Sequence, residues 1–250
     1  MIAKEGNLGM IEAGFSITGT STSTNVALAV MNPALVVFDI DGTLFQTELV
    51  TVPAVQRTFA AHGLPVPSAE KICSFFGMPN EEYLDWLAAM CSPEEAQTIV
   101  DDTNRLELEL VEREGRLYDG ARGVLDALKK DGYRLGVCSN GPEDYVDAFL
   151  DAHQVRSFFD IVRTRGSKYK DKTEMLREIV AVVKVRPVIV VGDRHDDILA
   201  AHANGARAIA TYYGFGAHEE LNDADARVNA VTEVPDAVRK LLAAPGWGPS

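Results

Sequence analysis

A short apolar run at residues 34–38 ends in two aspartates, and this junction constrains the chain more than any other feature. Asp39 and Asp41 follow the run directly, and Gly42 comes next. In an extended chain, side chains two residues apart point the same way, so the two carboxylates are expected to share one site. Two like charges this close persist only if a cation neutralises them or one of them holds a proton. The junction therefore indicates a reactive site or, in a simpler interpretation, a strand followed by an acidic turn.

The composition is typical of a globular protein with an acidic surface. A chain of 250 residues can form one large domain, or a core domain with an insertion. Its 37 acidic and 24 basic residues give a formal net charge of -13, which argues against binding to nucleic acid or to an anionic membrane surface. No stretch of the sequence approaches the roughly 20 consecutive apolar residues that cross a bilayer. An anionic substrate would have to be attracted locally, by a metal ion and a few lysines.

The cysteines and the first residues bear on location. Cys73, Cys91 and Cys138 show neither metal-ligand spacing nor the even number of a disulfide framework, which predicts a cytoplasmic protein. Residues 1–31 are expected to form a flexible extension, because their apolar patch is too short for a secretory signal. Met31 stands just before the first predicted strand, so a translation start there is a hypothesis. Loss of fold or activity on removing residues 1–30 would disprove it.

From residue 34 onward, short apolar runs alternate with amphipathic helical patterns. Continuous apolar strands separated by helices predict a parallel sheet that is covered on both faces and joined by right-handed crossovers. The sequence therefore predicts an α/β, doubly wound fold. The predicted strands are 35–38, 135–138, 161–162, 188–191 and 208–211, with a weaker candidate near Val228. The predicted helices of this part are 121–130, with Asp119 as a possible N-cap, 173–183 and 196–204.

One interval breaks this rhythm. Between Glu48 and Leu117 there is no convincing buried strand, only helical patterns at 55–62, 81–90 and 93–114. A long helical insertion directly after the first strand predicts a cap over the carboxyl edge of the sheet, where open α/β folds bind ligands. The predicted domains are the flexible extension at 1–31, an α/β core at 32–46 and 118–250, and a helical cap at 47–117.

Two further polar clusters precede predicted helices. Ser139 and Asn140 follow the strand at 135–138, and a hydroxyl with free backbone N–H groups at such a turn can hold phosphate oxygens. Ser-Asn-Gly is also a common structural turn. Lysines 168, 170 and 172 come just before the helix at 173–183. A lysine at the start of a helix can neutralise a phosphoryl group, but solvated lysines are also common there, and charge alone does not choose among the three.

A fourth cluster follows the strand at 188–191. Asp193, Asp196 and Asp197 place up to three carboxylates at this strand end. Acidic clusters beside buried strands are costly without a cation, and hard oxygen ligands favour Mg²⁺. Asp196 also suits the N-cap of the following helix. Because four such clusters occur together at strand ends, the sequence favours a metal-bound phosphoryl site.

These segments resemble the motifs of the haloacid dehalogenase superfamily, in its Mg²⁺-dependent phosphatase branch with a helical cap. The resemblance covers roughly residues 34–240, and it is far more specific for the superfamily than for a substrate. The matching segments are DIDGTLF at 39–45, SNG at 139–141, the lysine at 172 before TEML, and GDRHDD at 192–197. Residues 214–216 and 219–221 look like the downstream segment of phosphoglycolate phosphatase-like and nucleotidase-like members.

The resemblance implies roles for the acidic pair. Asp39 would attack phosphorus and become an aspartyl-phosphate. Asp41 would protonate the leaving alkoxide and then deprotonate the attacking water. Members of the superfamily that dehalogenate carbon lack an acid at this second position. The resemblance therefore implies a phosphatase.

The resemblance also implies a metal site. Mg²⁺ would be held by the Asp39 carboxylate, the Asp41 backbone carbonyl and Asp193, with Asp197 completing or orienting the set. The spacing of the second acid, four positions after the first, selects Asp197 over Asp196.

Other residues would hold the substrate. Ser139 and Lys172 would contact the remaining phosphoryl oxygens, and the residue count to the following helix selects Lys172 among the three lysines. Thr43 and Asn140 are further candidates for phosphate binding. In the cap, Phe76 and Gly77, with their neighbours 75 and 78, stand where related caps present a substrate loop, although two phenylalanines at this spacing are more often core residues.

We therefore expect a Mg²⁺-dependent phosphatase that acts on a small-molecule phosphomonoester, binds neither nucleic acid nor membrane, and is a monomer or homodimer. One alternative is a phosphomutase of the same superfamily, similar to β-phosphoglucomutase. A more distant one is a noncatalytic phospho-aspartate switch on a flavodoxin-like fold, against which the cap and Asp41 argue. Fold alone does not separate these.

Overall fold

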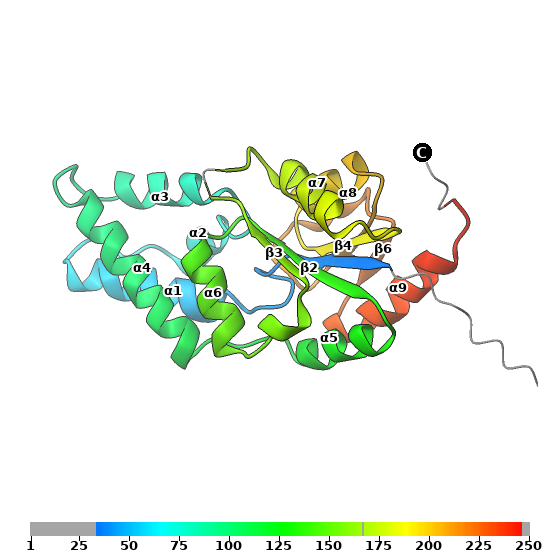
Figure 1. The fold of residues 1–250 in the computed structure, drawn as a ribbon. Helices are drawn as coiled ribbons and strands as arrows, with labels where there is room; N and C mark the ends of the chain where they lie inside the picture. The colour runs from blue at the N-terminus through cyan, green and yellow to red at the C-terminus, as the bar shows by residue number, and fades with distance from the viewer. Residues whose placement is uncertain (1–33, 167, 247–250) are drawn as a thin grey trace, which may run out of the picture. The chain divides into compact units, whose positions relative to one another are not determined.

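A parallel sheet lies at the centre of the computed structural model, which describes residues 34–166 and 168–246 (Figure 1). Within these residues the strand order is β3-β2-β1-β4-β5-β6, and every neighbouring pair is parallel. The predicted α/β doubly wound fold is confirmed. The strands are β1 (Leu35–Phe38), β2 (Arg134–Ser139), β3 (Ile161–Thr164), β4 (Val188–Gly192), β5 (Arg207–Thr211) and β6 (Ala226–Val228).

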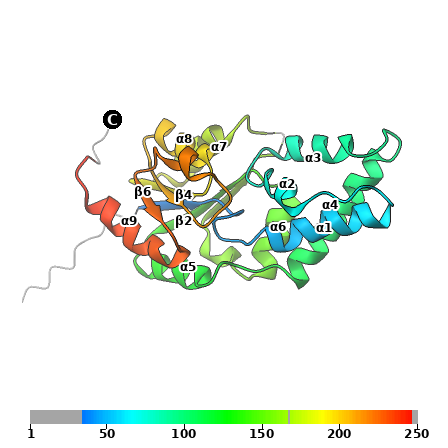
Figure 2. The same cartoon turned by 180° about the vertical axis from the view of Figure 1, so that it is seen from behind.

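Helices cover both faces of the sheet, and side chains of β1 alternate between them. Val36 and Phe38 belong to the apolar cluster that includes residues of α5, α6 and α9, whereas Leu35 and Val37 belong to the cluster with α7 and α8. Figures 1 and 2 show α5 and α9 on one side of the sheet and α7 and α8 on the other. The helices are α5 (Ala121–Lys130), α6 (Glu143–Ala152), α7 (Lys172–Val183), α8 (His195–Ala203) and α9 (Val234–Ala243), with short 3-10 helices at Arg156–Phe158, His218–Leu221 and Val231–Glu233.

The register of β1 places several loops at one edge. Phe38 pairs with Val137 of β2 and with Val191 of β4, and the backbone N–H of Asp39 donates to the Val191 carbonyl at 2.9 Å. The residues that follow these strands therefore emerge side by side at the carboxyl edge of the sheet, where ligands bind in this class of fold.

The elements predicted for the α/β core match the structure closely, with one incorrect cap. The helix at 121–130 is present with those bounds, but Asp119 is not its N-cap. The N-cap is Gly120, one residue after Asp119. Its φ of 89° turns the chain into the helix, and no side chain forms a hydrogen bond at this cap. Helices α7 and α8 each begin one residue before the predicted start.

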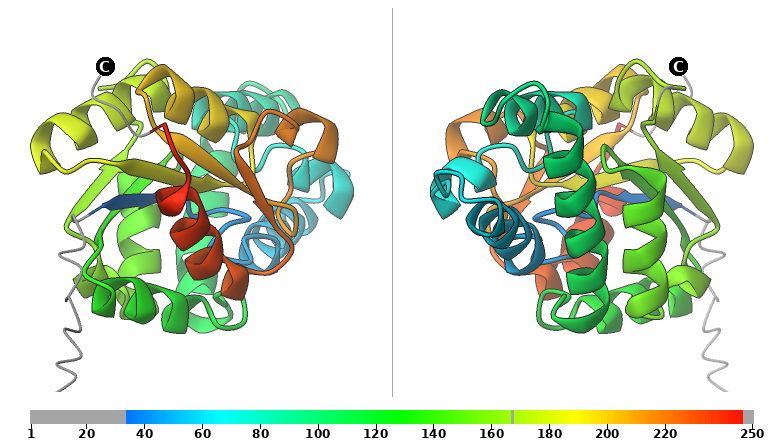
Figure 3. Two further views of the ribbon diagram at one scale, coloured as in Figure 1. Left: turned by 90° about the vertical axis from the view of Figure 1, so that its right-hand side faces the viewer. Right: turned by 90° about the vertical axis from the view of Figure 1, so that its left-hand side faces the viewer.

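Four helices occupy the interval between β1 and α5: α1 (Glu48–Ala61), α2 (Ala69–Cys73), α3 (Asn80–Ala89) and α4 (Ala96–Arg113). The sequence predicted three of them; it missed the five-residue α2 and began α1 seven residues late. Helices α1 and α4 pack against each other (Figure 3). These helices share an apolar cluster of their own, built from Val55, Phe59, Ile72, Phe76, Tyr83, Leu87 and Ile99. We call residues 47–117 the helical insertion.

The chain leaves and re-enters the sheet layer at one place. The Gln46 backbone N–H donates to the Arg116 carbonyl at 2.9 Å, and the Tyr118 N–H donates to the Leu44 carbonyl at 3.0 Å. These two hydrogen bonds are consistent with domain boundaries near 46 and 118. We propose that residues 47–117 form a cap on the α/β core. The predicted extension at 1–31, and with it the start-site hypothesis at Met31, lies outside the described residues. In the part of the chain that the structure describes, no helix is long and apolar enough to cross a membrane.

Candidate active site

Lys172 and Asp39 form a buried ion pair at the carboxyl edge of the sheet. The Lys172 Nζ lies 3.0 Å from Asp39 Oδ1 and 2.9 Å from Asp197 Oδ1, and the lysine side chain is 1% exposed. Lys172 is the first residue of α7, whose start is fixed by the Asp171 side chain accepting from the Glu174 backbone N–H. The helix start therefore delivers the ammonium group directly to the end of β1.

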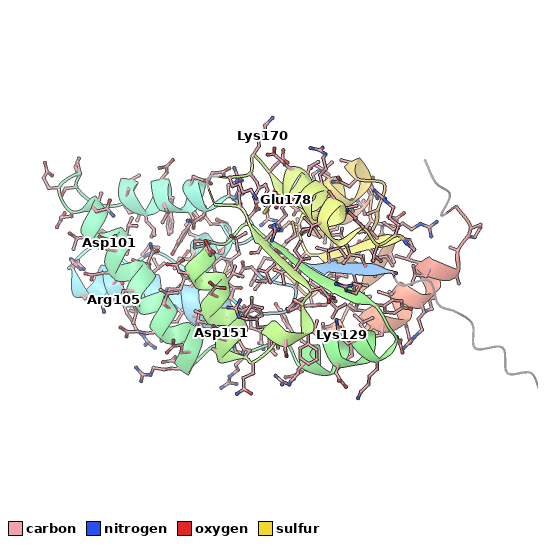
Figure 4. All side chains as sticks on the ribbon, viewed as in Figure 1. Asp101, Arg105, Lys129, Asp151, Lys170 and Glu178 are labelled. Atoms are coloured by element: carbon pink, nitrogen blue, oxygen red, sulfur yellow. The ribbon has the colours of Figure 1, made fainter. Side chains whose placement is uncertain are left out.

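The other two lysines of the triplet lie elsewhere. Lys168 donates to Glu178 at 2.9 Å and to the Tyr169 hydroxyl at 2.8 Å, on the exposed side of α7. Lys170 is exposed and points away from the protein (Figure 4). Geometry thus separates three residues that charge alone did not, and places Lys172 among the acids.

Three carboxylates converge on the same point. Ligand atoms of Asp39, Asp193 and Asp197 all lie within 4.8 Å of one another, and all three residues are buried. Asp193 Oδ2 accepts the Phe215 backbone N–H at 2.7 Å. Asp39 Oδ2 and Asp193 Oδ1 are buried without a hydrogen-bond partner. If all three carboxyl groups are ionised, they and the one ammonium group carry a net charge of -2 in a buried site. Because hard oxygens with unmet charge suit a divalent cation, the residues present fit Mg²⁺.

Burial also shifts the titration of these groups. Burial raises the pKa of Asp39, although the Lys172 ammonium opposes this. Burial, together with the charges of Asp39 and Asp197, holds the pKa of Asp193 well above its usual range. Burial raises the pKa of Asp197 to about 7. For Lys172, burial alone would lower the pKa, but Asp197 and Asp39 outweigh it and keep the ammonium charged. The four groups form one strongly interacting cluster.

Two glycines leave room for this cluster. Gly42 has φ of 71°, and a Cβ there would lie 2.2 Å from Asp193 Oδ2. A Cβ at Gly192 would lie 2.1 Å from the Asp197 Cγ. Any side chain at either position would displace a carboxylate, so the glycines of both acidic segments are required for the geometry.

Asp41 is held apart from this cluster by two hydroxyl groups. The Thr47 Oγ1 donates to Asp41 Oδ1 at 2.6 Å, and the Tyr145 hydroxyl donates to the same oxygen at 2.7 Å. Burial raises the Asp41 pKa, and these two hydrogen bonds act in the opposite direction. The sequence did not point to Thr47 or Tyr145, because neither belongs to a strand-end cluster.

The predicted phosphate-binding residues lie around the acids. Ser139 is buried at the end of β2, and its Oγ accepts the Gly141 backbone N–H at 3.0 Å. The Thr43 hydroxyl is buried without a partner. The Asn140 Nδ2 donates to the Gly77 carbonyl at 2.9 Å, so this residue links the sheet edge to the insertion, while its Oδ1 is buried without a partner.

Asp196 and Asp197 have different surroundings. Asp196 lies in the first turn of α8 and is half-buried. Asp197 Oδ2 accepts the Arg194 backbone N–H at 3.1 Å, so Asp197 rather than Asp196 caps the start of α8. Its other oxygen binds Lys172. Asp197 therefore joins the helix cap to the acidic cluster.

Arg194 connects the acidic edge to the insertion. Its Nη1 donates to the Phe76 carbonyl, and its Nε donates to Glu220 at 2.8 Å. The Phe76 ring also packs edge-on against Phe215, with ring centroids 4.7 Å apart. A Cβ at Gly77 would lie 2.6 Å from the Arg194 Cγ. The loop around Phe76 is thus held against the sheet edge by side-chain and backbone contacts.

A cavity of about 490 Å³, counting space open to solvent, lies between the insertion and the sheet edge. Asp41 lines it from the sheet, and Phe75, Phe76, Gly77 and Met78 line it from the insertion. Phe76 is also a buried member of the insertion's own apolar cluster. It is therefore both a core residue of the insertion and a residue that lines the cavity.

One acid of the cavity comes from α4. Glu107 is half-buried, and its Oε1 accepts the hydroxyl of Thr51 from α1. Burial raises the pKa of Glu107 to about 7. Both residues line the cavity, and the sequence predicted neither.

Comparison with known proteins identifies the family of this chain. The family described as haloacid dehalogenase-like hydrolase matches residues 36–211. The chain belongs to this family. It is 27% identical over 221 residues to phosphoglycolate phosphatase 1 of Pseudomonas aeruginosa, covering 84% of this chain and 79% of that protein. It is 26% identical over 216 residues to tyrosine-protein kinase PtkA of Mycobacterium tuberculosis, covering 84% of this chain and 73% of the relative.

The fold agrees with solved structures. A predicted phosphoglycolate phosphatase from Haemophilus somnus superposes with a TM-score of 0.75 at 21% identity, covering 84% of this chain and 99% of that one. The expected membership of the haloacid dehalogenase superfamily, in its phosphoglycolate phosphatase-like branch, is confirmed, and with it the prediction of a hydrolase of the phosphatase type.

Proposed function

We propose that this member of the family hydrolyses a small phosphomonoester with Mg²⁺, through a covalent phosphate on Asp39. The observation that carries the proposal is the buried cluster of Asp39, Asp193, Asp197 and Lys172, which has unpartnered carboxylate oxygens and three carboxyl groups to one ammonium group. Such a site binds a cation and an anionic phosphoryl group together more readily than either alone.

The proposed reaction has two steps. In the first, an Asp39 carboxylate oxygen forms a bond to phosphorus, the bond from phosphorus to the alcohol oxygen breaks, and Asp41 gives its proton to that oxygen. In the second, Asp41 takes a proton from water, the water oxygen bonds to phosphorus, and the bond to Asp39 breaks. Inorganic phosphate leaves, and both aspartates return to their starting states.

Asp41 is well placed for its proposed role. Thr47 and Tyr145 both bond to its Oδ1, which fixes the carboxyl group and leaves Oδ2 for proton transfer. Asp41 also lines the cavity where the leaving group would lie. A raised pKa from burial favours the protonated form that the first step needs.

The remaining residues would bind the phosphoryl group. Lys172 orients Asp39 through the 3.0 Å ion pair and would neutralise one phosphoryl oxygen. The hydroxyl of Ser139 and the unpartnered hydroxyl of Thr43 would bind others. In this proposal Asn140, Phe76 and Gly77 hold the insertion against the sheet edge and border the leaving-group cavity.

Mg²⁺ would be held by the carboxylates of Asp39 and Asp193 and by the Asp41 backbone carbonyl, with Asp197 nearby. When bound it would reduce the repulsion between Asp39 and the substrate. The donor atoms fit, because two of their carboxylate oxygens are buried without partners.

Assays with purified protein separate this function from its alternatives. Wild-type protein with Mg²⁺ is expected to release inorganic phosphate steadily from members of a phosphomonoester panel, and chelation with EDTA is expected to stop the release. Isomerisation that depends on a bisphosphate, without net phosphate release, would favour the phosphomutase. A long-lived acyl-phosphate without turnover would favour the switch. Phosphorylation of protein tyrosine without phosphate release from the esters, as the name of the mycobacterial relative would imply, would also contradict a hydrolase.

A further inference from the structure

The cavity that would receive the leaving group is lined by acidic side chains and, among the described residues, by no cationic one. Asp41 and Glu107 both line it, and none of the described residues that line it is a lysine, arginine or histidine. A leaving group that carries its own carboxylate, as in phosphoglycolate, would bring another negative charge beside Glu107. Without a cation to pair with it, such a charge is costly to bury.

Three cations lie on neighbouring segments but do not line the cavity. Lys172 is bound between Asp39 and Asp197. Arg194 binds Glu220 and the Phe76 carbonyl. The Arg165 Nη2 lies 3.9 Å from Glu81, an exposed residue, and the Arg165 Nε is buried without a hydrogen-bond partner. None of the three lines the cavity, so none is placed to neutralise an anionic leaving group there.

The cavity does offer unpartnered neutral polar groups. The Tyr83 hydroxyl and the Asn140 Oδ1 have no hydrogen-bond partner, and these residues are only 8% and 4% exposed. Both residues line the cavity. A buried polar atom without a partner is destabilising, so a ligand that supplies the missing partners would bind there favourably.

Glu107 adds a carboxyl group to this set. Its Oε1 is already bonded by Thr51, which fixes the carboxylate and leaves Oε2 to accept a bond from a ligand. Hydroxyl groups both donate and accept, so they match a tyrosine hydroxyl, an amide oxygen and a carboxylate at once. The apolar side chains of Phe75 and Met78 cover another part of the lining and suit the carbon skeleton of such a ligand.

We propose that Glu107 is a specificity-determining residue that excludes anionic leaving groups, and that the substrate is a phosphate ester of an uncharged, polyhydroxylated alcohol. This inference rests on the proposed function, because it concerns the alcohol that the reaction releases. It sets the chain apart from the activity named for its phosphoglycolate phosphatase relatives.

A matched pair of esters tests the proposal. Glycerol 1-phosphate and 3-phosphoglycerate have the same carbon skeleton and differ in an uncharged CH₂OH against a carboxylate. At pH 8, above the Glu107 pKa of about 7, wild-type protein is expected to show a kcat/KM at least about tenfold higher for glycerol 1-phosphate. Glu107→Gln is expected to reduce this preference about tenfold, mainly by improving the reaction of 3-phosphoglycerate. Glu109→Gln, two residues away on the exposed side of α4, is the control and is expected to keep the wild-type preference.

Each outcome decides one proposal or both. p-Nitrophenyl phosphate, whose leaving group is small and aromatic, reports the chemistry independently of hydroxyl recognition. If wild type hydrolyses it but prefers 3-phosphoglycerate, or if Glu107→Gln leaves the preference unchanged while melting like wild type, the specificity proposal is wrong and the proposed function stands. If Mg²⁺-loaded wild type hydrolyses none of the three esters, both proposals fail.

Discussion

The acidic cluster and the cavity beside it differ in whether their carboxyl groups are paired with a cation. At the cluster, Asp39 and Asp197 share a buried lysine, and the geometry is fixed by the helix start at Lys172. In the cavity, Glu107 has only the Thr51 hydroxyl as a hydrogen-bonded partner among the described side chains. Paired charges with a defined geometry suit bond making and breaking. The charge of an unpaired acid instead attracts or repels the group that binds beside it. The comparison suggests that the cluster determines the reaction and the cavity determines the alcohol.

Asp39→Asn should have the largest effect, because it removes the proposed nucleophile while keeping the shape of the side chain. Phosphate release is expected to fall at least about 1,000-fold, with an unchanged circular dichroism spectrum. Steady-state phosphate release measures it. Retention of a tenth of the wild-type rate would refute the nucleophile assignment.

Lys172→Met tests whether the paired lysine contributes to the reaction. We expect kcat to fall about 100- to 1,000-fold, because the phosphoryl oxygens and Asp39 both lose their cation. Lys170→Met changes the same residue type on the exposed loop and should leave kcat unchanged. Thermal melting of both variants checks folding, and similar kcat values for the two variants would remove Lys172 from the site.

Asp193→Asn tests the metal site. Its unpartnered Oδ1 is a proposed ligand, so the Mg²⁺ concentration for half-maximal activity should rise at least about tenfold. The rise in melting temperature on adding Mg²⁺ should also shrink, which is a readout independent of turnover. Asp196→Asn, outside the described acidic cluster, is the control. A metal titration equal to that of wild type would exclude Asp193 as a ligand.

Tyr145→Phe tests how Asp41 is held between the two regions. The variant loses one hydrogen bond to a carboxylate, worth about 1.5–3 kcal/mol, so kcat should fall roughly tenfold. Because that bond lowers the Asp41 pKa, its loss should move the alkaline limb of the pH–rate profile to higher pH. Tyr133→Phe is the control. Tyr133 stands just before β2 and its hydroxyl has no partner, so the substitution should change neither kcat nor the alkaline limb. An unmoved alkaline limb in Tyr145→Phe would contradict the role given to Asp41.

Glu107→Gln should have the smallest effect, on stability. Burial raises the Glu107 pKa to about 7, so the folded state favours the protonated carboxyl. The resulting stabilisation is present below the usual glutamate pKa and is lost as pH rises through 7. Wild type should therefore lose about 1 kcal/mol more stability than Glu107→Gln between pH 5 and pH 8, since a half-buried group is partly screened by solvent. Denaturant unfolding of both proteins at pH 5 and pH 8 measures this difference. An equal loss of stability in the two proteins would mean that the Glu107 carboxyl group is in a more polar environment than proposed.

The gathering of the strand-end residues was predictable because the register of a parallel sheet brings distant segments together. Asp39, Ser139 and Asp193 each follow an apolar run, and the pairing of β1 with β2 and β4 brings those run ends together. Lys172 was selected by its distance from the following helix. Gly120 shows the limit at a cap, because the sequence offered an aspartate one residue earlier and only the backbone conformation decides.

The cavity was not predictable in the same way. Thr51 and Glu107 are 56 residues apart on α1 and α4, and Tyr145 lies 104 residues from Asp41. No local spacing links such residues, because their contacts depend on how the helices of the insertion pack together and on α6. The short α2 was missed for a related reason, since five residues hold little periodic pattern.

Trapping the covalent phosphate tests the central claim most directly. Wild-type protein mixed with Mg²⁺ and a hydrolysable ester, quenched in acid within the first turnovers and digested, should yield a peptide with a hydroxylamine-labile phosphoryl group on Asp39. Asp39→Asn protein treated in the same way should yield none. A phosphoryl group on any other residue, or full turnover with no phosphorylated peptide at any quench time, would contradict the account.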